Sequence, residues 1–260
     1  KTLRTFLDSD KTVMMIINQH SNFSHPKLLV LPRGIPLTWG YTNKIVWDSM
    51  NFVVANERKV QLLASMASDW GPRPQIIKCI SEKFSESEFF GHTHGKVKKS
   101  KAKLGANTEE SRSAYYVQLA RARFGLMVPG MGYDCFRNWE MMLMGSIGVI
   151  ERAIGFDRTY WRLPVLLVDD FYDVTEDLLR SAYVQAIYGI EEFEFERLQQ
   201  SYWYGVIYNV STSRSVAPML DKFPMEAETP NFVRPFQPFY CGDNNEHCGS
   251  PGIKTPKRSC

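Results

Sequence analysis

Short apolar segments alternate with segments of helical periodicity over residues 58–210. The apolar segments are runs of consecutive apolar residues, which is typical of strands buried on both faces of a sheet. Strands are expected over 60–66, 124–128, 147–150 and 163–168. Helices are expected over 74–84, 111–123, 134–144 and 191–204, with a further helix that Asp173 or Thr175 would cap and that runs to about Tyr188. This alternation predicts an α/β fold in which a Rossmann-like parallel sheet carries helices on both faces.

Two segments with a different pattern flank this region, so the chain is expected to have three parts. Residues 1–57 contain two apolar strand candidates, at 12–18 and 25–36, and resemble the end of a larger amino-terminal domain. Residues 211–260 are rich in Pro, Gly and polar residues, which predicts a tail. Within the central region, residues 89–110 are basic and hydrophilic, which predicts an exposed loop.

The composition narrows the possible partners. The 260 residues suffice for one large domain or two small ones. The net charge of +3 is too small to indicate a nucleic-acid partner or an anionic membrane surface. The chain starts at Lys1 without a signal-peptide pattern, so we expect a fragment or a processed product whose anchor or targeting segment would lie upstream. Glycosylation tripeptides at 22–24 and 209–211 favour a secretory compartment.

The cysteines leave several alternatives open. Cys79 and Cys135 have apolar neighbours in predicted helices, which favours buried thiols. Cys241 and Cys248 bracket a polar loop and could form a small disulfide. A metal site that adds His247 to this pair is less favoured, because no second pair of ligands has a suitable spacing.

The most informative stretch is 124–140, which reads Phe-Gly-Leu-Met-Val-Pro-Gly-Met-Gly-Tyr-Asp-Cys-Phe-Arg-Asn-Trp-Glu. It predicts a strand, a turn that contains Gly130 and Gly132, and a helix that Asp134 would cap. A glycine-bearing backbone at the positive end of a helix is suited to holding a phosphate. The alternative for the two glycines is an ordinary turn that needs positive φ.

Two arginines and a glutamate add chemistry to this turn. Arg137 and Glu140 are three residues apart and share one helix face, which suits a guanidinium on a pyrophosphate and a carboxylate on ribose hydroxyls. The alternative is an exposed ion pair. Arg73 follows the first strand where a helix begins, and it could contact a phosphate or pack on Trp70 at the surface.

Three predicted loops follow strand ends and should converge on one crevice, because ligands of parallel sheets bind beyond the carboxyl ends of the strands. These loops cover 67–73, 129–134 and 169–174. Asp169 and Asp170 lie in the last loop, where they could act on a donor sugar, although strand-end aspartates are common turn and cap residues.

The chain also resembles a known family. The stretch 115–179 is similar to the carboxyl-terminal part of exostosin-like glycosyltransferases, which adopt the two-Rossmann GT-B fold. The resembling segments in this part are 124–130, 132–140, 143–147, 163–170 and 174–179. Upstream, 25–28 and 32–36 resemble the crossing between the family's two domains.

The resemblance implies a donor-binding domain for a nucleotide sugar, usually a UDP-sugar. It implies metal-independent, inverting transfer to a glycan or glycoprotein acceptor in the Golgi lumen, by an enzyme with an upstream membrane anchor. The chain could form a homo- or hetero-oligomer. Residues 1–57 would be the end of the acceptor domain. Arg137 corresponds to the phosphate-facing arginine and Glu140 to the ribose-binding acid. The expected donor-binding residues are Arg73, Gly130, Gly132, Asp134, Arg137 and Glu140.

The chain departs from the family at two positions. Gly130 stands where many relatives have arginine, and Gly148 stands where many have proline. The first departure leaves open a non-catalytic relative that binds nucleotide or serves as an assembly subunit. A dinucleotide-dependent oxidoreductase is disfavoured, because 130–135 does not complete a Gly-x-Gly-x-x-Gly pattern. No residue is identified as the catalytic base.

Two other patterns could suggest a metal ion. Asp8-Ser-Asp10 matches the Asp-x-Asp motif of metal-dependent glycosyltransferases, but it precedes its apolar run, which favours a turn or a helix cap. His92 and His94 lie in a lysine-rich stretch without a third ligand, which favours a solvated loop. No metal or other cofactor is therefore expected.

Overall fold

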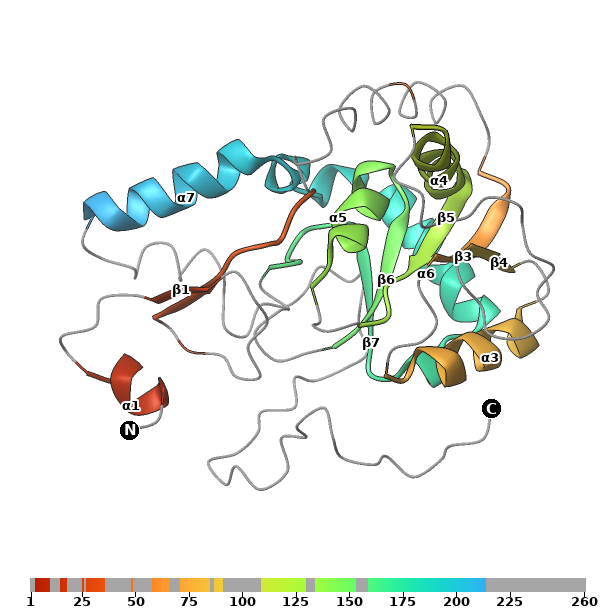
Figure 1. Cartoon of the computed structure of the whole chain (residues 1–260), viewed down its shortest axis with the longest axis horizontal. Coiled ribbons are helices and arrows are strands. Elements are labelled where there is room, and N and C mark those ends of the chain that lie inside the picture. Colours follow the sequence, from red (N-terminus) through yellow and green to blue (C-terminus); the bar gives the residue numbers. More distant parts are fainter. Residues whose placement is uncertain are drawn as a thin grey trace.

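The computed structural model describes residues 3–9, 15–17, 25, 27–35, 48, 58–65, 71–84, 87–90, 109–129, 134–152 and 159–213. The main body is a five-stranded parallel sheet with the order β4-β3-β5-β6-β7 (Figure 1). The strands are β3 (Val60–Ser65), β4 (Ser87–Phe90), β5 (Ala122–Leu126), β6 (Ile147–Glu151) and β7 (Val165–Val168). The prediction of an α/β fold with a Rossmann-like parallel sheet is confirmed at this level.

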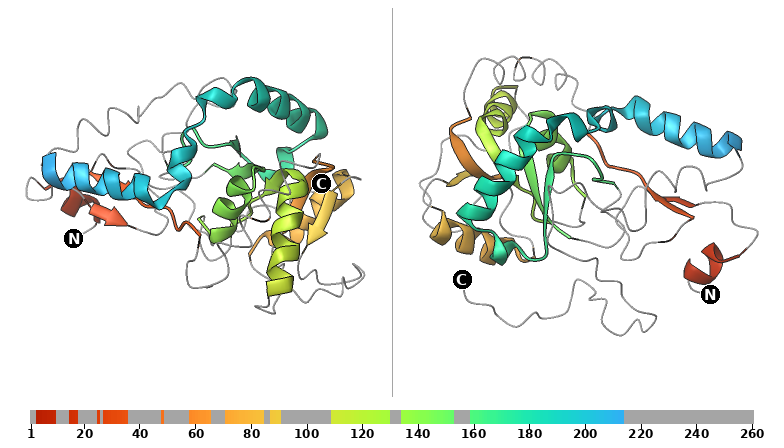
Figure 2. Two further views of the ribbon diagram at one scale, coloured as in Figure 1. Left: turned by 90° about the horizontal axis from the view of Figure 1, so that it is seen from above. Right: turned by 180° about the vertical axis from the view of Figure 1, so that it is seen from behind.

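Helices cover both faces of the sheet (Figure 2). They are α3 (Arg73–Lys83), α4 (Glu109–Arg121), α5 (Phe136–Leu143) and α6 (Glu176–Tyr188). On one face α5 packs over Gly125, and on the other the Tyr183 ring of α6 meets the Phe124 ring at 6.1 Å. Right-handed connections place α3 opposite α4 and α5, because β3 connects to β4 in one direction and β5 connects to β6 in the other.

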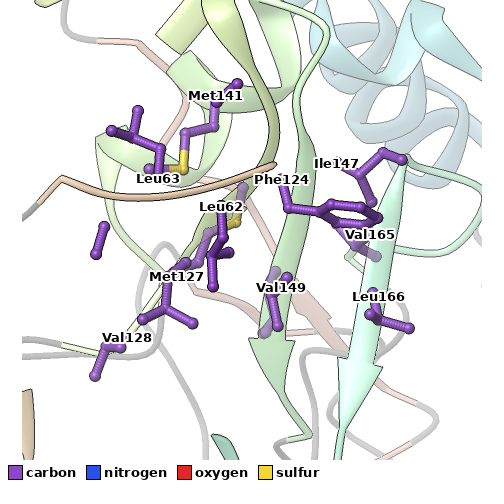
Figure 3. Close-up of a cluster of buried hydrophobic side chains, with 14 of the residues drawn as sticks. Leu62, Leu63, Phe124, Met127, Val128, Met141, Ile147, Val149, Val165 and Leu166 are labelled. Atoms are coloured by element: carbon purple, nitrogen blue, oxygen red, sulfur yellow. The ribbon is translucent and has the colours of Figure 1, made fainter. Parts of the chain in front are cut away.

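The core between the sheet and these helices contains a large cluster of buried apolar side chains, part of which Figure 3 shows. Gly125 and Gly148 are paired in register on neighbouring strands, and each leaves room for a methionine. A Cβ at Gly125 would lie 2.2 Å from Met141 Sδ, and one at Gly148 would lie 2.4 Å from Met127 Cε. The Gly148 amide donates to Pro164 O at 2.9 Å, so proline at this position would lose a sheet hydrogen bond.

Residues of the amino-terminal segment form a second, smaller unit. It contains α1 (Leu3–Leu7) and a parallel pair of short strands, β1 (Met15–Ile17) and β2 (Leu28–Val30). Both predicted strands are confirmed, with shorter bounds. Asp8 accepts a hydrogen bond from His25 Nε2 at 3.1 Å just after α1, so the described part of the Asp-Ser-Asp motif lies in a turn. Asp10 lies outside the described residues.

The boundary between α4 and β5 lies two residues earlier than predicted. The Arg58 guanidinium donates to Ala120 O at 3.1 Å and to Ala122 O at 2.8 Å. Ser146 Oγ donates to Leu119 O at 2.7 Å and to Ala122 O at 3.0 Å. These donors bind carbonyls of the last turn of α4 and the first carbonyl of β5, and they come from positions too distant in sequence for a local pattern to reveal.

Two other predictions need correction. The loop predicted at 89–110 contains the end of β4 and the start of α4, and residues 91–108 lie outside the described part of the chain. The helix predicted over 191–204 is wrong. The chain there forms two 3₁₀ helices, η2 (Ile190–Glu192) and η3 (Phe195–Leu198), and then α7 (Gln200–Ser213).

Arg197 explains the broken helix. Its side chain is fully buried and donates to Thr159 O at 3.4 Å, while its carbonyl accepts the Trp203 indole N–H at 2.8 Å. A continuous helix would not direct this guanidinium inward, so burial of Arg197 overrides the local helical pattern. Residues 211–213, which were predicted to begin the tail, instead end α7, and residues 214–260 lie outside the described residues. Within the described residues, no helix has the length and apolar character needed to cross a bilayer.

Three glycine-to-alanine substitutions test how the end of α5 is held. Gly145 has φ of +74°, and a Cβ there would lie 2.4 Å from Arg58 Nη2, which donates to Met144 O at 2.8 Å. We expect Gly145→Ala to cost more than the backbone strain of about 1–2 kcal/mol, because it also displaces the Arg58 guanidinium. Urea denaturation would measure the change in the free energy of unfolding.

Two other glycines separate these contributions. Gly71 has φ of +55° with open space around it, so Gly71→Ala should cost the strain alone. Gly205 lies in α7 with nothing within 4 Å, so Gly205→Ala should be neutral or stabilise by up to about 1 kcal/mol. A cost for Gly145→Ala no larger than that for Gly71→Ala would contradict the role assigned to Arg58.

Candidate functional site

The sheet reverses its winding direction between β3 and β5. After β3 the chain crosses to β4 on one side, and after β5 it crosses to β6 on the other. In open α/β sheets the connections diverge at such a point and leave a crevice beyond the carboxyl ends of the two strands. This edge is therefore where a ligand site is expected.

Arg73 links the two strand ends at this point. It is the first residue of α3, it is only 6 % exposed, and its Nε donates to Pro129 O at 3.0 Å. Its Nη2 donates to Val128 O at 3.1 Å. The alternative was a surface arginine that packs on Trp70. Arg73 is not at the surface, because it is buried. Trp70 lies outside the described residues, so the packing contact stays a prediction. The loops expected at 67–73 and 129–134 are thus joined by the hydrogen bond between Arg73 and Pro129.

Arg137 lies close to Arg73. Burial lowers the pKa of Arg73, and the neighbouring Arg137 guanidinium lowers it further. Arg137 lies in the first turn of α5 and is partly buried. No hydrogen bond or ion pair within the described part of the chain engages it. Arg73 therefore organises the strand ends, whereas Arg137 makes no such contact with another described residue.

Asp134 does not cap α5, which corrects the prediction. The helix begins at Phe136 with Cys135 as its N-cap residue, and no side chain caps its first turn. The prediction failed because other donors engage the Asp134 carboxylate. It accepts the Arg33 amide at 2.6 Å and, on its other oxygen, Trp139 Nε1 and the Tyr160 hydroxyl, each at 2.8 Å.

Asp134 is consequently a buried link between three parts of the chain. It is 4 % exposed, and burial raises its pKa while its hydrogen bonds act in the opposite direction. Its partners come from the segment after β2, from α5, and from the turn before β7. Tyr160 also accepts from Asn138 Nδ2 at 2.8 Å and stacks on Trp139 at 5.7 Å. The described contacts of Asp134 hold the position of α5 and do not themselves form a ligand site.

Glu140 is also buried, but it belongs to a different contact. Its Oε2 accepts the Tyr115 hydroxyl at 2.8 Å, and its Oε1 accepts the Tyr116 hydroxyl at 3.0 Å. The alternative of an exposed ion pair with Arg137 is wrong, because Glu140 is 4 % exposed and no ion pair joins these two described residues. Sequence reasoning missed both tyrosines, although their adjacency on α4 was the available signal.

The two cysteines of the described helices differ. Cys135 is a free thiol, as predicted, and donates to Asn138 Oδ1 at 3.0 Å; the residue is partly exposed, and desolvation raises its pKa. The prediction is wrong for Cys79, which is buried in α3 and disulfide-bonded to a partner outside the described residues. Cys241, His247 and Cys248 also lie outside them.

Carboxylates gather at the ends of β6 and β7. Asp170 accepts the Tyr172 amide at 3.0 Å and caps η1 (Phe171–Asp173), while Asp169 lies 3.5 Å from Arg152 Nε. These contacts agree with the interpretation as cap and turn residues. Glu151, which sequence reasoning did not select, ends β6, and burial together with Asp170 raises its pKa to about 7.

The remaining predicted site residues are the two glycines of the turn after β5. Gly130 and Gly132 lie outside the described residues, as do His92 and His94. Among the residues that are described, no group of three or more His, Cys, Asp or Glu side chains is arranged to hold a metal ion. Of the predicted site residues, Arg73 lies at the winding reversal, and Arg137 and Glu140 lie on α5, which follows β5. Asp134 instead forms buried hydrogen bonds that hold α5 in place.

No protein-family model and no curated protein matches this chain.

Substitution of Asp134 tests its structural role. Asp134→Ala would leave three donors in the interior without their acceptor, so we expect a loss of about 3 kcal/mol or more in the free energy of unfolding. Asp8→Ala is the matched control, because its pair with His25 is exposed and should be worth less than about 1 kcal/mol. Similar small losses in both variants, measured by urea denaturation, would show that the Asp134 contacts contribute little.

Glu151 predicts a pH dependence of stability. Its folded-state pKa of about 7 exceeds the ordinary value of 4.5, so the folded state binds more protons between these pH values. The free energy of unfolding should therefore fall as pH rises from 4.5 to about 7. Glu151→Gln removes this contribution and should gain stability relative to the parent chain between about pH 5 and about pH 8.

The control removes one negative charge elsewhere, in Glu191→Gln on the exposed surface of η2. Thermal unfolding of all three chains across this pH range would provide the comparison. A Glu151→Gln profile parallel to that of the parent chain would contradict the prediction.

Proposed function

We propose that this chain is the donor-binding part of an exostosin-like glycosyltransferase of the GT-B fold, together with the end of its acceptor domain. The reaction would move a sugar from a nucleotide donor, a UDP-sugar, to a hydroxyl group of a glycan or glycoprotein. The observation that carries the proposal is that Arg73 joins the strand ends at the winding reversal of the sheet and lies within electrostatic range of Arg137.

The charge at this edge supports binding of a diphosphate. Arg73 is fixed by the carbonyls of Val128 and Pro129, so its positive charge is held in place before any ligand arrives. Arg137 adds a guanidinium that no described contact engages, in the uncapped first turn of α5. Guanidinium groups and helix amino termini both stabilise phosphate oxygens.

Glu140 supports the nucleoside end of the same ligand. It lies one helical turn beyond Arg137, and each carboxylate oxygen accepts one tyrosine hydroxyl. A carboxylate oxygen has capacity for a second hydrogen bond, so Glu140 can also accept from ribose hydroxyls. Arginine and glutamate at this spacing match the diphosphate and ribose of a nucleotide sugar.

In the proposed transfer, the acceptor hydroxyl oxygen attacks the anomeric carbon of the donor sugar. The bond from that carbon to the phosphate oxygen breaks, and the diphosphate leaves with the bonding electrons. Arg137, with Arg73 behind it, would stabilise the developing negative charge. Attack opposite to the leaving group gives inversion, and the proton passes to a base that the resemblance assigns to the amino-terminal domain.

The proposed location is the Golgi lumen, with a membrane anchor upstream. Two observations support an oxidising, secretory setting. Cys79 is disulfide-bonded, which is common in secreted and lumenal proteins. Asn209, the acceptor of a glycosylation tripeptide, is exposed on α7.

Calorimetric titration of UDP into this chain tests the proposal. We expect binding that EDTA leaves unchanged, since the site would use guanidinium groups in place of a metal ion. Arg137→Ala should weaken binding about tenfold or more, the loss expected for one charge-assisted hydrogen bond. Arg180→Ala, on the exposed face of α6, is the matched control and should bind as the parent chain does.

The outcomes separate the alternatives. No binding of UDP to the folded chain, or equal binding by Arg137→Ala, would contradict the proposed donor site. Binding without sugar transfer by the full-length protein would favour a non-catalytic nucleotide-binding subunit, the alternative that Gly130 leaves open.

A further inference from the structure

Two adjacent tyrosines on α4 hold the carboxylate of Glu140 from across the helix interface. The Tyr115 hydroxyl donates to Oε2 at 2.8 Å, and the Tyr116 hydroxyl donates to Oε1 at 3.0 Å. Adjacent helical residues project about 100° apart, so two neighbours rarely reach the same group. Here the ring centroids are 5.4 Å apart and the ring planes are inclined by 63°, and both hydroxyls reach one carboxylate.

The two contacts are not equivalent. Tyr116 is fully buried, so Oε1 faces the interior between α4 and α5. Tyr115 is partly exposed as a residue, so of the two hydrogen bonds of Glu140 the one on Oε2 is the less deeply buried. The Arg137 guanidinium acts electrostatically on Tyr115, in the sense that lowers its pKa, although burial and Glu140 together raise that pKa. Tyr115 therefore lies near both the cation and the carboxylate that the proposed donor site uses.

We propose that Tyr115 is a positioning residue that aims Oε2 of Glu140 at a ribose hydroxyl and so makes the site selective for ribonucleotides. This inference rests on the proposed function, because it concerns the same site.

The physical basis is restriction of one torsion. A glutamate has three side-chain torsions, and its terminal torsion is broad when nothing fixes the carboxylate. A hydrogen bond to each oxygen fixes the carboxylate plane. Oε2 then keeps one acceptor position that a ribose hydroxyl can use without first paying the entropy of ordering the side chain. Removal of the Tyr115 hydroxyl would leave Oε2, the oxygen proposed to accept the ribose hydroxyl, without the hydrogen bond that orients it.

The test compares UDP with its dideoxyribose analogue, which lacks both ribose hydroxyls, by calorimetric titration. The parent chain should bind UDP more tightly than the analogue. Tyr115→Phe should weaken binding of UDP about fivefold to tenfold and leave binding of the analogue unchanged. A merely structural role of Tyr115 would weaken both ligands equally, because both carry the same diphosphate and base. Tyr204→Phe, which removes an exposed hydroxyl on α7, is the control and should change neither.

A second variant examines the same contact from its other end. Glu140→Gln keeps the size of the side chain but replaces one oxygen with a donor, so it should also lose the preference for UDP. Addition of Tyr115→Phe to Glu140→Gln should cause no further loss, because the two residues act through one contact. This cycle remains informative if Tyr115→Phe alone proves too unstable to titrate.

Each result bears on the inference in a defined way. Loss of the ribose preference in Tyr115→Phe, with non-additive losses in the double variant, would support it. Equal weakening of both ligands, tighter binding of UDP, or additive losses would overturn it while the Arg137-dependent binding still supports the proposed function. Absence of UDP binding to the folded parent chain would overturn both.

Discussion

The close packing of α5 on the sheet is the constraint on which the candidate site depends. Met141 reaches the sheet at Gly125, where any side chain would collide with its sulfur. This contact lets the helix lie flat with its first turn at the carboxyl end of β5. From that position Arg137 comes close to Arg73, and Glu140 faces the tyrosines of α4. A larger residue in place of Gly125 would therefore move the cation and the carboxylate together.

The polar residues around this helix are buried and paired rather than exposed. Asp134 and Glu140 are each 4 % exposed, and Arg73 is 6 % exposed. Buried charged groups are costly unless hydrogen bonds compensate for lost hydration, and here backbone amides, carbonyls and aromatic donors provide that compensation. The hydrogen bonds of these three residues therefore stabilise the fold, whether or not the residues also bind a ligand. Arg137 is different, because its contribution to ligand binding can be measured without breaking a described hydrogen bond.

The sequence predicted the strands and helices whose signals are local. The apolar runs of β3, β5, β6 and β7 and the Thr175 cap of α6 follow directly from residue pattern. It failed where a distant group decides the outcome. Arg58 ends α4 early, Arg197 breaks the expected final helix, and Arg33 and Tyr160 occupy the carboxylate that was expected to cap α5. For the site, the spacing of Arg137 and Glu140 identified both residues, but not the direction in which Glu140 points.

The distribution of charge along the carboxyl edge of the sheet indicates how a donor would lie. Arg73 and Arg137 make the edge positive near β3 and β5, whereas Asp170, together with Glu151 above its pKa of about 7, adds negative charge near β6 and β7, where Asp169 is paired with Arg152. A diphosphate is attracted to the first region and repelled from the second. With Glu140 fixing the ribose one turn further along α5, the sugar would extend from the diphosphate, away from the nucleoside. Under the proposed function, the polarity of this edge therefore favours one direction of donor binding.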